Sequence, residues 1–184
     1  MINPYEKGKT IYLRTPSKDD ISKSWYQWFS DSETTEFLAD RWWPNSVEAQ
    51  ESFYEHMITN KSSLVLSVCD IKTDAHIGVC SLGSINWVHR NADIALVIGD
   101  KKFKNGMVAV ETMSLLIKIA FKRLNLLNLR SVYVESHPHT PNLMKLFKFK
   151  KVGILKEYFF HNRNYVDIII TQLQRTDWEK IKQK

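Results

Sequence analysis

Cysteine is scarce in this sequence, with Cys69 and Cys80 the only two among 184 residues. Neither is spaced with a histidine or a second cysteine as zinc ligands are, so a zinc centre and a disulfide framework are both excluded, and we expect no metal. Both cysteines lie in apolar segments with a strand-like pattern. We therefore expect them to be buried free thiols.

Long apolar runs are also missing. No stretch approaches the length that crosses a bilayer, and residues 1–6 lack the apolar segment of a signal peptide. We therefore expect a cytoplasmic protein without membrane contact. Hydrophobic residues make up 43% and charged residues 25% of the chain, as in a globular protein with a real core. In the absence of repeats or linkers, we expect one domain over residues 1–184.

No single basic tract is present, although the net charge is +6. The basic residues form separate groups at 101–104, 118–123 and 145–151. No nucleic-acid-binding motif accompanies them, so a nucleic-acid partner is the less favoured interpretation. The charge suits an anionic small molecule instead.

The hydrophobic periodicity predicts an α+β fold, a mixed sheet with helices on both sides. Expected strands cover residues 10–14, 63–71, 75–85, 92–98, 127–135, 152–160 and 165–173, and expected helices begin near residues 17, 31, 45, 107 and 140. Ser17 and Asn45 are the predicted first caps, each followed by an acid three residues later. Ile21, Trp25 and Trp28 share one helix face and are expected to pack on the sheet. The charged tail from Asp177 is expected to fray.

The stretch 91–124 combines a strand, a short basic loop and a long amphipathic helix from about Met107. The first N–H groups of a helix have no partner within it, and the helix dipole adds positive charge at that end. The lysines at positions 101, 102 and 104 strengthen the field. This pattern predicts a site for a phosphate-bearing cofactor. On this stretch alone, a plain crossover helix with a solvated basic loop fits equally well.

Several segments, taken in order, resemble those of one enzyme family. The segments are residues 11–20 (IYLRTPSKDD), 28–38 (WFSDSETTEFL), 92–100 (ADIALVIGD), Glu111, 152–158 (VGILKEY) and 162–167 (NRNYVD). They resemble the GNAT N-acetyltransferases, and most closely the branch of ribosomal-protein N-terminal and amino-sugar acetyltransferases. The resemblance implies a sheet of six to seven strands flanked by about four helices. It also implies a splay between the fourth and fifth strands.

The same resemblance implies acetyl-CoA as cofactor and transfer of its acetyl group to a primary amine. The implied cofactor contacts are Leu96, Val97, Ile98, Lys104, Asn105, Gly106, Met107, Val108, Ala109, His137 and Asn142. The loop departs from the family pattern, because Lys104 replaces Arg or Gln and Met107 replaces a glycine. Met144 stands where the family often has a tyrosine that protonates the leaving thiolate.

The acceptor amine must lose a proton, since a free alkylamine has a pKa of ~10. A carboxylate or an imidazole can accept that proton. The candidates are Asp93 on the fourth strand, Glu135 at the end of the fifth, and His137 just beyond it. Each of them also fits an ordinary surface side chain.

Substrate selection is assigned to Arg41, Trp42 and Trp43, because two adjacent tryptophans before a proline do not both bury easily. A ring-covering role with Arg41 on a phosphate or carboxylate, a cover over the core and a homodimer contact all remain open. We expect an amino-sugar nucleotide or another small anionic amine as acceptor. The alternatives are a protein N-terminal amine, and a non-catalytic module that binds an acyl-CoA.

Overall fold

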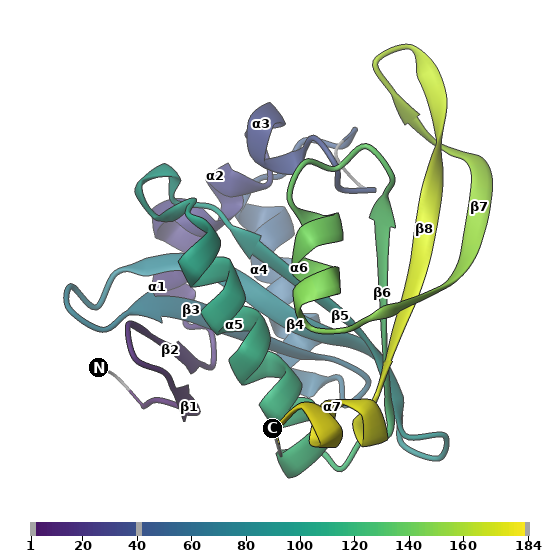
Figure 1. Cartoon of the computed structure of the whole chain (residues 1–184). Helices are drawn as coiled ribbons and strands as arrows, with labels where there is room; N and C mark the ends of the chain where they lie inside the picture. The colour runs from purple at the N-terminus through teal and green to yellow at the C-terminus, as the bar shows by residue number, and fades with distance from the viewer. Residues whose placement is uncertain (1–2, 40–41, 183–184) are drawn as a thin grey trace.

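The computed structural model describes residues 3–39 and 42–182, and these form a mixed sheet flanked by helices (Figure 1). The sheet has eight described strands in the order β1-β2-β3-β4-β5-β6-β8-β7. The strands are β1 (Glu6–Lys7), β2 (Ile11–Arg14), β3 (Leu64–Asp70), β4 (His76–Asn86), β5 (Asn91–Ile98), β6 (Asn128–Val134), β7 (Lys150–His161) and β8 (Asn164–Gln174). All neighbours are antiparallel except β5 and β6, because a crossover helix connects those two.

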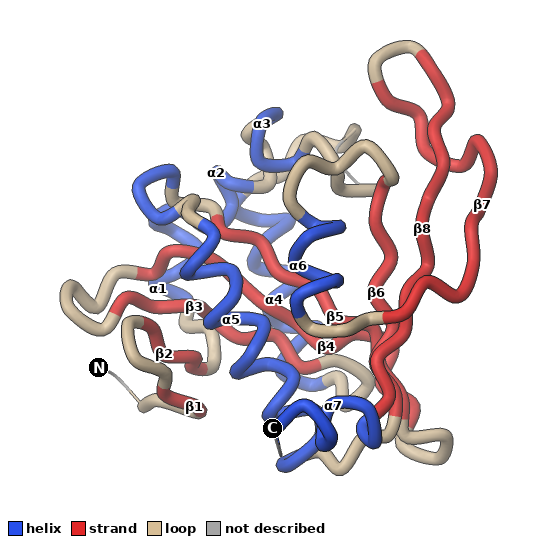
Figure 2. The backbone as a smooth tube through the Cα atoms, viewed as in Figure 1, coloured by secondary structure: helices blue, strands red, loops and turns tan. Residues whose placement is uncertain are grey.

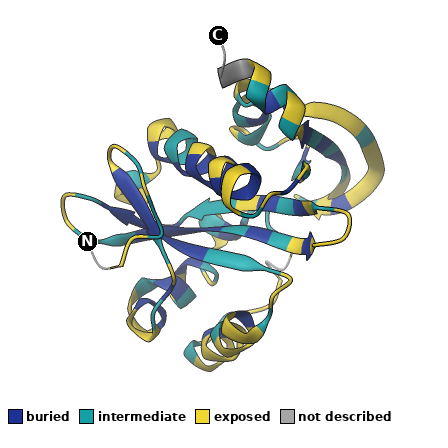
Figure 3. Cartoon of the chain, turned by 90° about the horizontal axis from the view of Figure 1, so that it is seen from below, coloured by how far each residue is buried: buried dark blue, intermediate teal, exposed yellow. Residues whose placement is uncertain are grey.

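Helices lie on both sides of the sheet and turn their buried residues toward it (Figures 2 and 3). The helices on one side are α1 (Lys18–Asp20), η1 (Ile21–Trp25), α2 (Tyr26–Trp28), α3 (Ser32–Thr35) and α4 (Val47–Thr59). Those on the other side are α5 (Gly106–Lys118), η3 (Ile119–Arg123), α6 (Thr140–Leu146) and α7 (Arg175–Lys182). The 3-10 turn η2 (Lys101–Phe103) precedes α5. None of the helices among the described residues is long and apolar enough to cross a membrane.

The larger core lies between the sheet and α5. Met113, Leu116 and Ala120, on one face of the amphipathic helix predicted from about Met107, are at most 2% exposed there. Both cysteines are free and buried, as the sequence predicted. Their burial fits the apolar strand segments in which they occur.

The smaller core lies on the opposite face of the sheet. Ile21, Trp25 and Trp28 pack there with Met57 and Val79, which confirms the predicted face. The helix that carries them begins with the predicted capping box, since the Ser17 N–H donates to the Asp20 carboxylate over 2.8 Å. It then widens into a π-helical turn at η1.

Four details differ from the sequence prediction. The short strand β1 makes the sheet eight-stranded, whereas six or seven strands were expected. Ser46, not Asn45, caps α4 through its hydroxyl oxygen, which frees the Asn45 side chain for another contact. His139, not Thr140, is the N-cap of α6. The tail is ordered as α7, because Trp178 is buried against Phe121 with ring centroids 5.3 Å apart.

Candidate functional site

A gap opens between β5 and β6, as the family resemblance implied. Their pairing covers only three residues of each strand and ends at Asp93 opposite Arg130. Beyond that point the two strands diverge (Figure 1). Leu96, Val97 and Ile98 therefore lie on a stretch of β5 that pairs with no described strand on the β6 side. Backbone groups on such an edge are available to a ligand that lies along it as an extra strand.

The end of β5 is held against its neighbours by two glycines. A Cβ on Gly78 of β4 would lie 2.4 Å from the carbonyl oxygen of Val97, and a Cβ on Gly99 would lie 2.0 Å from the ring of Trp28. Neither position tolerates a side chain without a shift of its surroundings. The unpaired stretch is thus fixed in place by close packing.

Helix α5 begins beside this gap with an accessible N-terminus. Asn105 is its N-cap, and its side-chain oxygen accepts a hydrogen bond from the N–H of Val108 over 3.1 Å. That bond removes the Val108 N–H from ligand contact, whereas the N–H groups of Gly106 and Met107 have no acceptor within the helix. A Cβ added to Gly106 would meet nothing within 4 Å. Met107 is 79% exposed. The geometry fits an anion in front of Gly106.

The lysines of the loop are not all free to meet that anion. Lys101 and Lys104 both contact the carboxylate of Glu33, at 2.7 and 3.5 Å, and Lys104 also donates to the hydroxyl of Thr34. Hydrogen bonding to Lys101 lowers the pKa of Glu33. The field predicted from three lysines is therefore partly offset by Glu33.

Glu111, which matched the family pattern, has a structural contact here. Its carboxylate accepts from the backbone N–H groups of Lys9 and Thr10 and from the Thr10 hydroxyl. These bonds tie α5 to the turn between β1 and β2. Glu111 thus holds α5 in position against the β1–β2 turn.

His137, Glu135 and Asn142 follow the far end of β6. The Nδ1 atom of His137 accepts from the N–H groups of His139 and Thr140, both at 3.2 Å, so this imidazole caps α6. Burial and the neighbouring His139 lower the pKa of His137. Glu135 and Asn142 are exposed. A capping Nδ1 is not available to take a proton, which makes His137 a poor candidate base.

Asp93 lies at the apex of the gap. Its carboxylate receives two hydrogen bonds from Arg130, at 2.6 and 2.7 Å, and this hydrogen bonding raises the pKa of Arg130. Because strand side chains alternate, Asp93 shares a face of β5 with Ala95 and Val97. Of the three predicted bases, only Asp93 lies on the same strand as the pocket described next.

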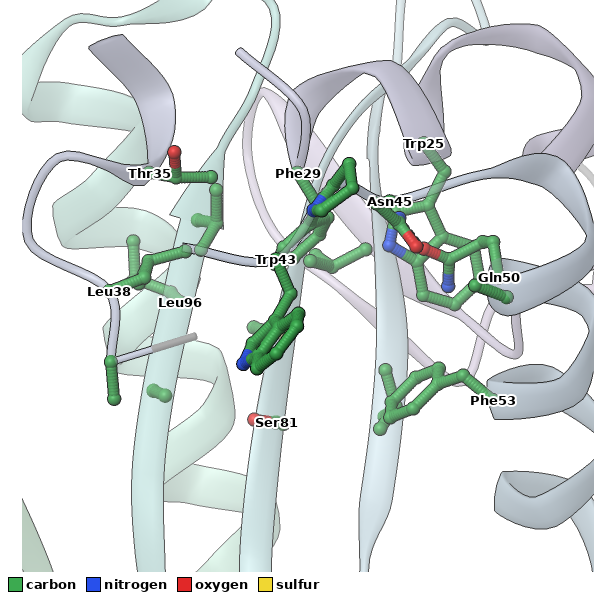
Figure 4. Close-up of a pocket in the computed structure, with 18 residues that line it drawn as sticks. Trp25, Phe29, Thr35, Leu38, Trp43, Asn45, Gln50, Phe53, Ser81 and Leu96 are labelled. Atoms are coloured by element: carbon green, nitrogen blue, oxygen red, sulfur yellow. Dashed lines mark hydrogen bonds between the residues drawn. The ribbon is translucent and has the colours of Figure 1, made fainter. Parts of the chain in front are cut away.

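A pocket of about 540 Å³ opens on the helix α4 side of β4 and β5 (Figure 4). Its lining residues are Trp25, Phe29, Thr35, Leu38, Ala39, Trp43, Pro44, Asn45, Ala49, Gln50, Phe53, Val65, Val79, Cys80, Ser81, Ala95, Leu96 and Val97. The volume is in the usual range for a small-molecule site. Since β5 supplies both this wall and the edge of the gap, a molecule in the pocket can meet a molecule in the gap.

The two adjacent tryptophans are separated by the structure. Trp43 is 78% exposed yet lines the pocket, and its indole lies across the opening (Figure 4). Trp42 packs on Phe160 of β7 with centroids 5.8 Å apart and is not part of the lining. Arg41, the third predicted substrate residue, lies outside the described residues. Of the segment assigned to substrate, Trp43 is the part placed at the pocket.

An amide pair at one end of the pocket was missed by sequence reasoning. The Asn45 side-chain N–H donates to the Gln50 side-chain oxygen over 2.9 Å and to the Tyr26 carbonyl over 3.4 Å. Figure 4 shows the two amides facing each other beside Trp25. The capping-box pattern at Asn45 concealed this role. No local signal marks Gln50 or Phe53.

A buried ionic cluster supports the helices behind the pocket. Arg14 pairs with Asp20 at 2.6 Å, the Ser67 hydroxyl donates to the same carboxylate, and His76 lies 3.5 Å from it. Burial alone would raise the pKa of Asp20, but hydrogen bonding from Arg14 lowers it to about 2. Burial lowers the pKa of His76 to about 4, against the opposing effect of Asp20. His76 is thus neutral, wedged at 4.9 Å from the ring of Trp28.

Met144, at the position of the family's tyrosine, is 2% exposed and belongs to the larger core. A buried thioether cannot donate a proton. This position of α6 therefore carries no acid. A second hollow of about 330 Å³ lies nearby, lined in part by Lys145, Lys148, Lys150 and Lys151.

One family model matches this sequence, and solved structures share this architecture. A family model described as an acetyltransferase (GNAT) domain matches residues 10–150. No curated protein matches the sequence.

Several solved structures have the same fold. One is a spermidine N-acetyltransferase from Vibrio cholerae in complex with CoA and spermine, with a TM-score of 0.86, 20% identity, and coverage of 94% of this chain and 99% of its own. A probable acetyltransferase has a TM-score of 0.80, 16% identity, and coverage of 93% and 96%. A dodecameric spermidine N-acetyltransferase from Vibrio cholerae in an intermediate state has a TM-score of 0.79, 20% identity, and coverage of 93% and 97%. At these identities the likeness concerns the fold.

Proposed function

Because this chain belongs to the acetyltransferase (GNAT) domain family, we propose that it binds acetyl-CoA in the gap between β5 and β6 and acetylates a primary amine held in the pocket lined by Trp43. Members of this family are N-acetyltransferases that use acetyl-CoA as donor, and this chain is one of them. The acceptor and the residues that contact it are the proposal. The observation that carries it is the shared wall: β5 borders the gap on one side and the pocket on the other.

The residues present fit the cofactor. The open N-terminus of α5 would hold its pyrophosphate through the N–H groups of Gly106 and Met107. The unpaired edge of β5 would bond the amides of its pantetheine arm, and N–H groups near Val97 and Ile98 would polarise a carbonyl. Bound acetyl-CoA supplies a thioester carbon that an amine can attack, with CoA leaving as the thiolate.

We assign the acceptance of the amine proton to Asp93, directly or through water. It faces the pocket side of β5, and its two hydrogen bonds from Arg130 hold the carboxylate in place. The buried Met144 leaves its position without an acid. A thiol of pKa ~8.5 leaves readily as the thiolate at neutral pH, so such an acid is not required.

Thiol release measured with acetyl-CoA and a panel of primary amines tests the proposal. We expect amine-dependent release in the wild type, and a loss of about 100-fold in kcat/KM in Asp93→Asn, the usual scale for a general base. The matched control is Glu135→Gln, for which we expect wild-type activity. Equal losses in the two variants would contradict the assignment to Asp93. Absence of amine-dependent release across the panel, at saturating acetyl-CoA, would contradict the proposed transfer.

A further inference from the structure

The described lining of the pocket carries no charged side chain. Among the 18 described residues that line it, none is an aspartate, glutamate, lysine, arginine or histidine. Trp25, Phe29, Trp43 and Phe53 form much of the wall. A second ammonium or a phosphate placed here would lose its water without gaining a counter-charge, which is costly. The described part of the lining therefore favours an uncharged group over the second ammonium of a polyamine or the phosphates of a nucleotide sugar.

One polar group in this apolar wall has an unused donor. The Tyr26 carbonyl can only accept, so it orients the Asn45 amide with its N–H groups toward Tyr26 and Gln50. The Gln50 oxygen faces Asn45, and its Nε2 group then has no hydrogen-bond acceptor among the described residues. Gln50 is only 4% exposed and lines the pocket. An amide N–H without an acceptor at the wall of a pocket points to a ligand or water that accepts from it.

A second donor in the same wall is also unsatisfied. The indole N–H of Trp25 is buried and has no hydrogen-bond partner among the described residues. Trp25 lines the pocket beside the amide pair (Figure 4). This end of the pocket therefore holds the amide pair and the indole N–H, while the rest of the described lining is apolar apart from Thr35, Cys80 and Ser81.

We infer that the acceptor is an amine on an uncharged body: an aromatic or aliphatic group fills the pocket, and a neutral carbonyl oxygen accepts a hydrogen bond from Gln50 Nε2. The inference rests on the proposed acetyl transfer and specifies its substrate class. Trp43, which is 78% exposed at the opening, covers the apolar group when it binds. A ligand carbonyl relieves the unpaired amide, an effect of about 10-fold on binding.

Three amines separate the classes: L-phenylalaninamide, with an aromatic ring and a neutral carbonyl; 2-phenylethylamine, with the ring alone; and spermidine. In the wild type we expect kcat/KM to fall in that order, with spermidine at least about 100-fold below the first. In Gln50→Met the preference for L-phenylalaninamide over 2-phenylethylamine falls about 10-fold. Differences in intrinsic amine reactivity cancel when this ratio is compared between the two proteins. The control is Trp42→Ala, which leaves the ratio unchanged.

A second readout needs no turnover. With CoA present, L-phenylalaninamide quenches or shifts the tryptophan fluorescence of the wild type, and Trp43→Phe removes most of that change. An unchanged ratio in Gln50→Met, or a preference of the wild type for spermidine, overturns the inference while leaving acetyl transfer intact. Failure of the proposed function has another signature, since acetyl-CoA would then support no transfer to any of the three amines.

Discussion

The start of α5 and the pocket lined by Trp43 contrast in how they recognise a ligand. The start of α5 offers backbone N–H groups, open space at Gly106 and exposed lysines shared with Glu33. The pocket offers aromatic walls and an amide with a free donor. The start of α5 suits the charged pyrophosphate of acetyl-CoA, and the pocket suits the uncharged part of the acceptor amine.

This contrast shows how the two regions depend on the rest of the chain. Backbone donors at a helix start depend little on side-chain identity, which explains how Met107 can stand where the family has glycine. The pocket depends on packing between elements far apart in sequence, such as Phe53 on α4 and Leu96 on β5. Substitutions should therefore separate donor binding from acceptor binding.

The largest effect is expected from Gly106→Glu. The added carboxylate would project into open space where the pyrophosphate is proposed to lie, so acetyl-CoA affinity should fall at least about 100-fold through charge repulsion. An acid in the first turn favours the helix, so the thermal midpoint should not fall. Titration calorimetry measures the affinity, with Gly106→Ala as the control of near wild-type affinity. Unchanged acetyl-CoA binding by Gly106→Glu would place the anion site elsewhere.

The unfolding free energy of the protein should depend on pH through His76, which lies in the ionic cluster behind the pocket. Its folded pKa of about 4 lies below the unfolded value, so the unfolded chain binds more protons between these values and stability falls as pH decreases. Between pH 7 and pH 5 we expect a loss of about 2 kcal/mol of unfolding free energy from this group.

Urea unfolding at the two pH values measures that loss. His76→Phe keeps an aromatic ring against Trp28 and removes the titration, so its curve should be flatter by the same amount. Asp20, with a pKa of about 2, stays ionised throughout this window and does not contribute. Parallel pH curves for the two proteins would show that His76 is not buried neutral.

Trp43→Ala should raise the KM of an apolar acceptor about 10-fold, because the exposed indole no longer covers the bound group. The acetyl-CoA affinity should not change. Trp42→Ala is the matched control, since Trp42 packs on Phe160 and does not line the pocket. Steady-state kinetics with 2-phenylethylamine gives the comparison, and a larger effect at Trp42 would reverse the assignment.

The smallest effect is expected from Glu33→Gln. Removing this carboxylate frees Lys101 and Lys104, so acetyl-CoA should bind about 2-fold tighter at low ionic strength. The gain should vanish at high salt, where exposed charges are screened. Calorimetry at two salt concentrations measures it. Tighter binding that persists at high salt would point to a conformational effect instead.

Much of the fold could be predicted, because local patterns determine it. The hydrophobic periodicity predicted a mixed sheet with helices on both sides, and the family resemblance implied a splay between the fourth and fifth strands; both features are confirmed. The tail helix was missed, since the charge around Trp178 concealed a residue that packs on Phe121. A two-residue strand such as β1 has too little pattern to detect.

The candidate site could be predicted only where backbone geometry forms it. The loop and helix start follow from their order in the chain, whereas the use of Asn105 as a cap and of Glu33 as a partner of the lysines depends on tertiary contacts. Gln50 looked like an ordinary helix residue. Its free N–H becomes significant only when Asn45 and Trp25 are seen beside it.

The central claim is that acetyl-CoA and the acceptor amine bind in separate regions, both of which border β5. Calorimetric titration of acetyl-CoA into wild type, Gly106→Glu and Trp43→Ala tests this directly. We predict one acetyl-CoA per chain in the wild type, the same affinity in Trp43→Ala, and no measurable binding in Gly106→Glu. Wild-type affinity in Gly106→Glu, or a loss of acetyl-CoA binding in Trp43→Ala, would contradict the account.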